Sequence, residues 1–461
     1  MGSDFWRAAG IIFAIAAFSA IGVLSGRHVK TKADYYVAGR RFGALPMTAT
    51  TAGMYLGGGA LIGTAQLAFT NGFSGVYFSL GCLLALAGTG LFLSEKVRRG
   101  GQETIQEIVR NEFGRTAGVL STLLGILAFY INCMSQFFSG ISLVGSILPG
   151  ASVLVSSLIT AGLILVCVYM GGFLSMSLIN IIKSVVLLTT ALISAAFIFA
   201  ATHHFADLAA ALPAEHLTLF PRGAGTDVGN CLSSALGIIS TQGTIQAIFA
   251  AKDDRSCKIG FTLGGLILPV AGACCMLIGM YMRATAPEIN ALEAFPQFII
   301  RHTHGLLSGT LLATLLIAVA SAGVSLVLGI SSILVNNFYL RLRPDADTKS
   351  QLRFSRALIV LLLLLTVVII NTGASDSIMQ YNFLSMGLRS TVLFLPMCAA
   401  LFLPGKVSSR FACAAIVAGP ISLLIGRYIL KLPFDCMFFG MAAGAAVMLL
   451  GVLDQRRQAR V

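Results

Sequence analysis

Thr50–Gln66 reads TTAGMYLGGGALIGTAQ and lies inside a hydrophobic segment that runs from about Ala44 to Thr70. The segment is long enough to cross a bilayer, because a spanning helix needs about 20 apolar residues. It nevertheless carries Gly53 and three consecutive glycines, Gly57–Gly59, near its middle. Each interior glycine costs roughly 1 kcal/mol of helix stability relative to alanine. The run therefore predicts an interrupted helix near Gly57–Gly59, or close helix packing through small residues.

An interruption at this depth has a chemical consequence. Unwound backbone within a membrane is tolerated only where protein buries it or where it lines a cavity. Its free carbonyl groups then bind a cation or a substrate, as in transporters with discontinuous helices.

The composition indicates a polytopic membrane protein with a single transmembrane domain over residues 1–461. Of the 461 residues, 57% are hydrophobic and 11% are charged, and the mean hydropathy is +0.89. The net charge of +13 does not indicate a nucleic-acid partner, because the basic residues fall in short loops between hydrophobic segments. The ten cysteines show no paired spacing, so we interpret them as small buried side chains. No nucleophile–base pair, metal-ligand cluster or phosphate-binding loop is visible, which argues against an enzyme and against ATP-driven transport.

About thirteen hydrophobic segments are expected to span the membrane. Basic residues collect in alternate loops, such as Arg98 and Arg99 after the third segment and Lys252 and Lys258 after the seventh. This bias predicts an external N-terminus and a cytoplasmic C-terminus in a plasma membrane, the bacterial inner membrane. The segments are 7–26, 44–70, 72–95, 115–148, 151–170, 174–201, 227–251, 259–281, 306–339, 354–372, 382–403, 409–429 and 434–453.

Two connections have features of their own. Residues 102–113 (QETIQEIVRNEF) are too polar to span, and we expect a short amphipathic helix at the cytoplasmic surface. Thr202–Asp227 is a longer, external connection, and its histidines lack the spacing of metal ligands.

Five stretches have a distinctive sequence: YYVAGRRFGALP (35–46), TIQEIVRNEFG (104–114), MGGFLSMSLINIIK (170–183), TIQAIFAAKD (244–253) and SAGVSLVLGISSILVNNFY (321–339). In this order along the chain, they resemble the sodium:solute symporter family, which includes the sodium/proline and sodium/galactose transporters. The resemblance implies an all-α, LeuT-type fold with two inverted five-helix repeats, at 44–201 and 227–403, and peripheral helices at 7–26, 409–429 and 434–453.

The resemblance also implies an ion site where the broken second helix passes the ninth. Its oxygen ligands for Na⁺ would be the carbonyls of Gly53, Leu56 and Ala318 and the hydroxyl of Ser321. The family's second hydroxyl corresponds to Ala322, so one expected oxygen is missing from this site.

The sixth helix departs from the family pattern as well. The usual Thr-Asp pair corresponds to Ile179 and Asn180, and a Gln three residues later corresponds to Lys183. A lysine within a span costs about 2.5–3.5 kcal/mol on insertion scales, so its side chain needs a partner or a cavity. Lys183 either extends to the cytoplasmic interface or places its ammonium where Na⁺ would lie, as in some proton-coupled relatives of the fold.

The substrate cavity is expected at the midplane between helices 2, 4, 7 and 11. For each polar candidate, ordinary hydrogen bonding between helices is as good an explanation as substrate contact. Arg389 on helix 11 either holds a solute carboxylate in two hydrogen bonds or pairs with a structural neighbour. The candidate lining residues are Tyr55, Gly57, Ala60, Tyr130, Asn132, Gln136, Ser240, Gln242, Gln246 and Arg389.

These observations predict a secondary active transporter for a small polar or anionic organic solute. The alternatives are an ordinary Na⁺-coupled symporter and a transporter-like membrane receptor. We expect no cofactor beyond a coupling ion, Na⁺ or H⁺, and no obligate protein partner apart from the lipid bilayer.

Overall fold

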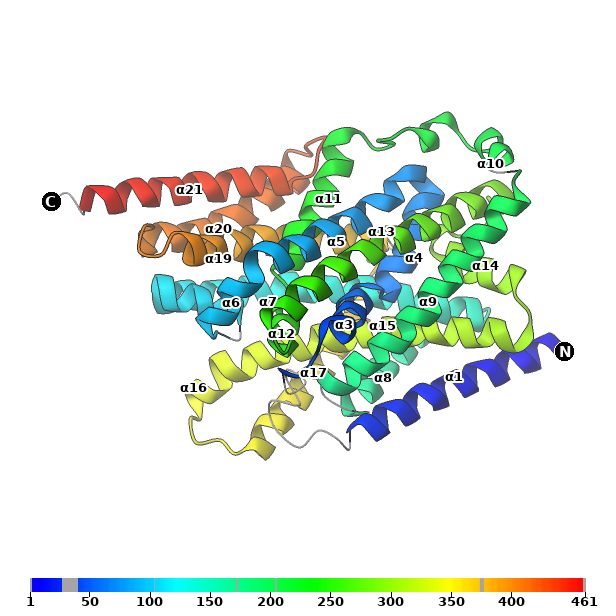
Figure 1. Ribbon diagram of the computed structural model, residues 1–461, viewed down its shortest axis with the longest axis horizontal. Coiled ribbons are helices and arrows are strands. Elements are labelled where there is room, and N and C mark those ends of the chain that lie inside the picture. Colours follow the sequence, from blue (N-terminus) through cyan, green and yellow to red (C-terminus); the bar gives the residue numbers. More distant parts are fainter. Residues whose placement is uncertain are drawn as a thin grey trace.

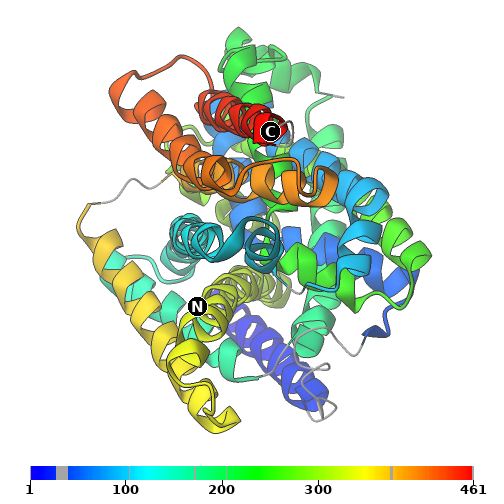
Figure 2. The same cartoon turned by 90° about the vertical axis from the view of Figure 1, so that its left-hand side faces the viewer.

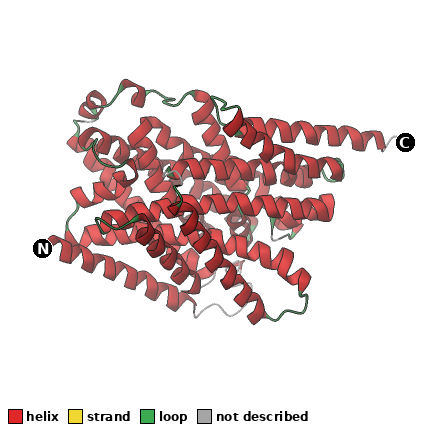
Figure 3. Cartoon of the chain, turned by 180° about the vertical axis from the view of Figure 1, so that it is seen from behind, coloured by secondary structure: helices red, strands yellow, loops and turns green. Residues whose placement is uncertain are grey.

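The computed structural model describes residues 2–26, 40–102, 104–170, 173–203, 205–373 and 377–458. Within these residues the chain is helical, without a strand, and Figure 3 shows helices joined by loops. Phe42 and Ala251 form an isolated bridge. The all-α fold is therefore confirmed. Part of the basic loop after the first span, the beginning of the 35–46 motif and Arg460 lie outside the described residues.

The first half of the chain forms long helices separated by short connections. A π-helical turn, η3 (Thr89–Leu93), and a 3-10 turn, η2 (Gly72–Val76), interrupt the third expected span. The helices are α1 (Gly2–Gly26), α3 (Ala44–Tyr55), α4 (Gly58–Asn71), α5 (Tyr77–Gly88), α6 (Ser94–Gly100), α7 (Ile105–Ile147), α8 (Val153–Met170) and α9 (Phe173–Ala201).

The second half repeats this pattern of long and interrupted helices. Its short turns are η4 (Ala214–Leu217), η5 (Ala291–Glu293), η6 (Val335–Tyr339), η7 (Ser390–Phe394) and η8 (Ile425–Ile429). The helices are α10 (Ala206–Ala211), α11 (Ala224–Ile239), α12 (Gln242–Ala250), α13 (Asp254–Thr285), α14 (Ala294–His302), α15 (Gly305–Leu334), α16 (Leu340–Leu342), α17 (Thr348–Asn371), α18 (Ile378–Arg389), α19 (Leu395–Phe402), α20 (Ser409–Leu424) and α21 (Met437–Gln458).

α7 contains the predicted amphipathic helix as its first part. Thr104 caps it, because its side chain accepts a hydrogen bond from Glu107 N at 3.1 Å. Gly114 then adopts φ 87°, a left-handed conformation that favours glycine, and turns the chain into the long apolar part of α7. The polar and the apolar parts are thus two helices joined by a kink.

α7 lies near the middle of the bundle, and α1 and α17 lie at its periphery (Figure 2). α20 and α21 pack against each other on the other side of the bundle. The N- and C-terminal ends lie at opposite ends of the molecule's longest axis (Figure 1). A bundle of this kind keeps its polar backbone groups bonded within each helix, except where a helix is broken.

Among the described residues, nine helices are long and apolar enough to cross a membrane. Shorter apolar helices cover Phe5–Ala20 and Val153–Val168. The expected count of thirteen spans is not confirmed. The second and seventh expected spans are each divided into two shorter helices, and Gly58–Gly100 forms one continuous helical stretch of 43 residues.

Candidate functional site

The helix expected over 44–70 is broken at Leu56–Gly57. α3 ends at Tyr55, and Leu56 has φ −77° and ψ 59°, which is not helical. Gly57 is extended, with φ −97° and ψ 165°, before α4 begins. Within the described residues, no backbone N–H donates to the carbonyl oxygen of Gly53 or of Leu56. The predicted interruption is therefore present, and it leaves carbonyl groups outside the helical hydrogen-bond pattern.

The same glycines allow neighbouring helices to approach the break. A Cβ atom on Gly53 would lie 2.5 Å from the carbonyl oxygen of Asn180 on α9. A Cβ atom on Gly57 would lie 3.3 Å from the Cβ atom of Ala322 on α15. Both interpretations of the glycine run hold, since the helix is interrupted and also packs closely through small residues.

Lys183 of α9 reaches α15 beside this break. The residue is 1% exposed, and Nζ donates to Ser321 Oγ at 2.6 Å. Ser321 Oγ in turn donates to the carbonyl oxygen of Ala318 at 3.1 Å. Lys183 makes no hydrogen bond to the carbonyls of Gly53, Leu56 or Ala318 in the described part of the chain, so its ammonium contacts this group through the serine hydroxyl. The interpretation that Lys183 extends to the cytoplasmic interface requires an exposed ammonium, whereas the side chain is buried here.

A second broken helix was missed by the sequence analysis, which predicts one continuous helix over 227–251. α11 ends at Ile239, and α12 begins at Gln242. Thr241 between them is extended, with φ −91° and ψ 133°. Two features of the sequence could have indicated this break. One is the polar pair Ser240–Thr241 in the middle of the span, and the other is the inverted repeat, which relates helix 7 to the broken helix 2.

One hydrogen bond joins the two breaks directly. Tyr55, the last residue of α3, shares a hydrogen bond of 2.6 Å with Thr244 of α12. Thr244 Oγ1 also donates to the carbonyl oxygen of Ile238, across the second break, at 2.8 Å. Tyr55 was a candidate lining residue, whereas Thr244 was not.

Arg389, at the end of α18, contacts the second break. The residue is 1% exposed, and Nη1 donates to Thr241 Oγ1 at 2.7 Å. Nη2 donates to Ser385 Oγ at 3.0 Å, and the guanidinium carbon lies 5.1 Å from the centre of the Phe129 ring. No carboxylate lies within ion-pair distance of Arg389 among the residues that the structure describes. A buried guanidinium held only by hydroxyl and carbonyl groups and an aromatic ring still lacks an anion.

Polar side chains of α7 lie beside the first break, near the start of α4. Asn132 and Gln136 are 7% and 6% exposed, and the side-chain oxygens of both residues have no hydrogen-bond partner. The Ser135 hydroxyl is also buried without a partner. Gln136 Nε2 lies 2.6 Å from where a Cβ atom of Gly59 would be, so these side chains adjoin the start of α4. Unpaired buried acceptors are costly, which favours a ligand that supplies donors.

Other candidate lining residues are less well placed. The Tyr130 hydroxyl accepts a hydrogen bond from Thr366 of α17 at 3.1 Å, on a different face of α7 from Asn132. The Ser240 hydroxyl donates to the carbonyl oxygen of Leu236 at 2.9 Å, within its own helix. Ala60 and Gln246 are partly buried, and Gln242 is buried.

Around the two breaks the described residues offer carbonyls, hydroxyls and two cations, and no acidic metal ligands. Among the described residues, no three His, Cys, Asp or Glu side chains are placed to hold a metal ion. The oxygen groups around the first break suit a hard monovalent cation, but the Lys183 ammonium already contacts one of them.

Several solved structures share this architecture. A substrate-bound, outward-open Na⁺-coupled sialic acid symporter matches with a TM-score of 0.78 and 17% identity, over 98% of this chain and 97% of that chain. The inward-facing form of Mhp1 matches with a TM-score of 0.57 and 14% identity, over 92% of this chain and 93% of that chain. MhsT in complex with L-phenylalanine matches with a TM-score of 0.57 and 16% identity, over 90% of this chain and 99% of that chain. The overall architecture and the two broken helices define a LeuT-type fold.

The chain belongs to the sodium:solute symporter family, whose sequence model matches residues 35–419. Members of this family transport small solutes across membranes. The family therefore supports secondary active transport, a membrane location and a role other than catalysis.

Proposed function

We propose that the protein transports a small organic acid by alternating access and that Lys183 takes the place of the coupling sodium ion. The solute binds between the two broken helices, and its carboxylate lies against Arg389. Transport is coupled to protons or is independent of ions.

The buried cation of helix 11 supports an anionic solute. Arg389 has hydroxyl, carbonyl and aromatic neighbours and no carboxylate partner within the described residues, and a planar guanidinium can bind a carboxylate through two parallel hydrogen bonds. The unpaired oxygens of Asn132 and Gln136 require donors, so the solute also carries hydroxyl or N–H groups. Together these groups favour a hydroxy or amino acid over a neutral, apolar solute.

The observation that carries the coupling proposal is the 2.6 Å contact between Lys183 Nζ and Ser321 Oγ. Asn180 supplies no carboxylate, and Ala322 supplies no second hydroxyl. A sodium ion about 4 Å from the ammonium would be repelled by roughly 4 kcal/mol at an effective dielectric constant of 20, about a thousandfold in affinity. The ammonium binds Ser321 Oγ, one of the oxygens that the family resemblance assigns to Na⁺.

An ordinary Na⁺-coupled symporter is the second candidate. One similar structure is that of a Na⁺-coupled symporter, which favours this alternative. In that case Na⁺ would bind to the carbonyls of Gly53, Leu56 and Ala318 and to Ser321, with Lys183 displaced. A receptor without transport activity is a third candidate, and solute uptake by reconstituted protein distinguishes it from both transporters.

The proposal extends to the arrangement of the chain in the membrane. The core repeats are 44–201 and 227–403, and the N-terminus is external and the C-terminus cytoplasmic in a bacterial inner membrane. The broken helices α3–α4 and α11–α12 open the two proposed repeats, which supports this division.

The first test is uptake into proteoliposomes of a solute chosen by a thermal-shift screen of hydroxy and amino acids. Lys183→Ala should abolish uptake, because it leaves the oxygen groups around Ser321 without a cation. Lys406→Ala, at an exposed lysine, is the matched control and should transport normally. Full activity of folded Lys183→Ala protein would contradict the proposed role of the lysine.

A further inference from the structure

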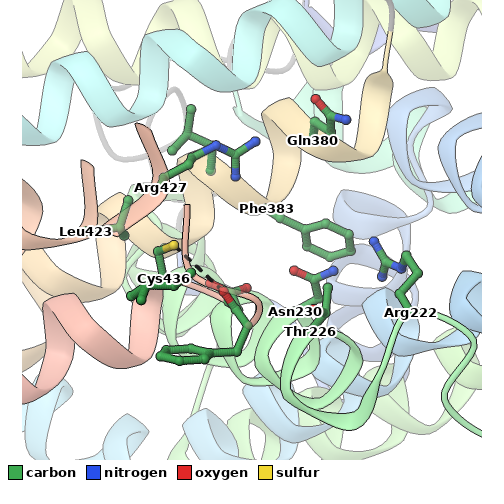
Figure 4. A pocket seen from close by; sticks show the side chains of 13 residues that line it. Arg222, Thr226, Asn230, Gln380, Phe383, Leu423, Arg427 and Cys436 are labelled. Atoms are coloured by element: carbon green, nitrogen blue, oxygen red, sulfur yellow. Dashed lines mark hydrogen bonds between the residues drawn. The ribbon is translucent and has the colours of Figure 1, made fainter. Parts of the chain in front are cut away.

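A separate cavity of about 250 Å³ lies between α11, α18, η8 and the loop before α21. Its wall combines the side chains of Phe383, Leu384, Leu423 and Leu432 with those of Arg222 and Arg427. In Figure 4 the Arg427 side chain reaches into the cavity, with Gln380 and Phe383 beside it. The volume lies just below the range typical of drug-sized ligands, which limits an occupant to a small molecule.

One of the two arginines is already neutralised. Arg222 Nε and Nη2 donate to Asp227 Oδ1 at 3.0 and 2.7 Å. Asp227 is fully buried, and Ser74 donates to its second oxygen at 3.0 Å. The guanidinium of Arg222 also lies 5.9 Å from the centre of the Phe383 ring, which fixes that wall of the cavity.

Arg427 has no such partner. In the described part of the chain it makes no ion pair or hydrogen bond, and its neighbour is the ring of Tyr428, with a centroid 5.8 Å away. Its guanidinium therefore keeps its donors available on the cavity side.

The carboxylate of Asp435 faces the cavity but is held by other donors. Met437 N donates to Oδ1 at 2.8 Å, and Ser233 Oγ donates to Oδ2 at 3.0 Å. With its amide oriented to suit its neighbours, Asn230 also donates to Oδ2, at 2.8 Å. The charges of Asp435 and Arg427 lie close enough to interact electrostatically, but the described residues show no ion pair or hydrogen bond between the two side chains.

We propose that this cavity is a second binding site, for a small organic carboxylate with an apolar or aromatic body. The carboxylate binds to Arg427, and the body lies against Phe383 and the leucines. The site is distinct from the one at Arg389, and it stands on the cavity and its charges whether or not the central site transports an acid. By the charge pattern of the loops it opens on the face that we expect to be external.

The experiment measures binding of 4-fluorobenzoate to the full-length protein by ¹⁹F NMR in phosphatidylcholine nanodiscs. The uncharged 4-fluorobenzamide has nearly the same shape and serves as the matched ligand. We expect Arg427→Gln to weaken benzoate binding at least tenfold. Arg410→Gln, at an exposed arginine near the other end of α20, should leave binding unchanged.

A second set of measurements separates this site from its alternatives. Asp435→Asn removes the opposing negative charge and should tighten binding severalfold, and Arg389→Gln should preserve the Arg427-dependent binding. Equal binding of the amide, or full binding by folded Arg427→Gln protein, would overturn the proposal. Loss of binding in Arg389→Gln would assign the benzoate to the central site instead. Displacement by added phosphatidylglycerol would assign the cavity to a lipid phosphate and would also overturn the proposal.

Discussion

Lys183 and Arg389 are two buried cations, one beside each of the two broken helices. Lys183 contacts a hydroxyl of α15, and Arg389 contacts a hydroxyl at the second break. Neither has a carboxylate within ion-pair distance among the described residues. An isolated charge inside a protein is strongly destabilising unless an anion or a dense set of dipoles compensates it. We attribute the two cations to different tasks, the coupling site for Lys183 and solute recognition for Arg389.

The proposed recognition by Arg389 can be tested with a charged and a neutral solute. Breaking a buried, hydrogen-bonded charge pair costs about 2–5 kcal/mol, so Arg389→Gln should raise the KM for the acid roughly thirtyfold or more. The KM for the corresponding amide should change much less. Arg389→Lys keeps the charge but loses the fork of donors, so an intermediate effect is expected. If the acid and the amide lose affinity equally, Arg389 is a structural residue and the carboxylate assignment is wrong.

The broken helices combine two demands on the same few residues. Gly57 is extended at the break, and a Cβ atom there would pack tightly against Ala322 of α15. Gly53 lies in the adjoining turn of α3, where a Cβ atom would collide with the backbone of α9. The second break has no such glycine at its centre, since Ser240 and Thr241 form it and bond to the carbonyls of their own helix. Hydroxyl groups can replace the hydrogen bonds that an interrupted helix loses.

The close packing of α4 on α15 predicts the effect of a single methyl group. A Cβ atom on Gly58 would lie 2.0 Å from Val319 Cγ2. Gly58→Ala should therefore destabilise the protein by about 1–3 kcal/mol, as overpacking does, and lower its Tm. Val319→Ala in the same protein removes the Cγ2 atom that collides and should restore part of the loss, while Cβ remains 3.1 Å away.

The matched control is a glycine of α7 that has room for a side chain. Among the described residues, no heavy atom outside the adjoining backbone of α7 lies within 4 Å of a Cβ atom built on Gly145. Gly145→Ala should raise stability by about 0.5–1 kcal/mol, because alanine favours the helix. An unchanged Tm for Gly58→Ala, measured by thermal unfolding in detergent, would contradict the close contact described above.

At the scale of the whole molecule, the hydrophobic segments and one glycine run were sufficient to predict an all-α transporter and its first broken helix. Asn180, Lys183, Ser321 and Ala322 could be grouped because the family resemblance aligned two distant helices. The second break could not be found in the same way, since Ser240–Thr241 interrupts a hydrophobic span without glycines or prolines. Tyr130 lies on the face of α7 that contacts α17. A helix sequence without strong hydrophobic periodicity does not show which of its faces contacts which neighbour.

The uncompensated charges also predict how the carrier cycles. An empty carrier must pass through its closed state with Arg389 unpaired, whereas a carrier loaded with an acid passes through it neutralised. Exchange of solute across the membrane should therefore be faster than net uptake. Proteoliposomes preloaded with the solute should show a higher initial uptake rate than empty ones. Equal rates in both would mean that the empty carrier returns freely and that Arg389 is compensated in another way.

The most direct measurement of the central claim is the initial rate of solute uptake when Na⁺ is replaced by choline. If Lys183 occupies the sodium position, the rates in the two solutions should agree, and an imposed pH gradient should change them if protons are coupled. A protein carrying Lys183→Gln, Asn180→Asp and Ala322→Ser together has the lost oxygens restored, and its uptake should become dependent on Na⁺. Strict dependence of the unmodified protein on Na⁺, with a saturable activation curve, would contradict the account and identify an ordinary sodium site.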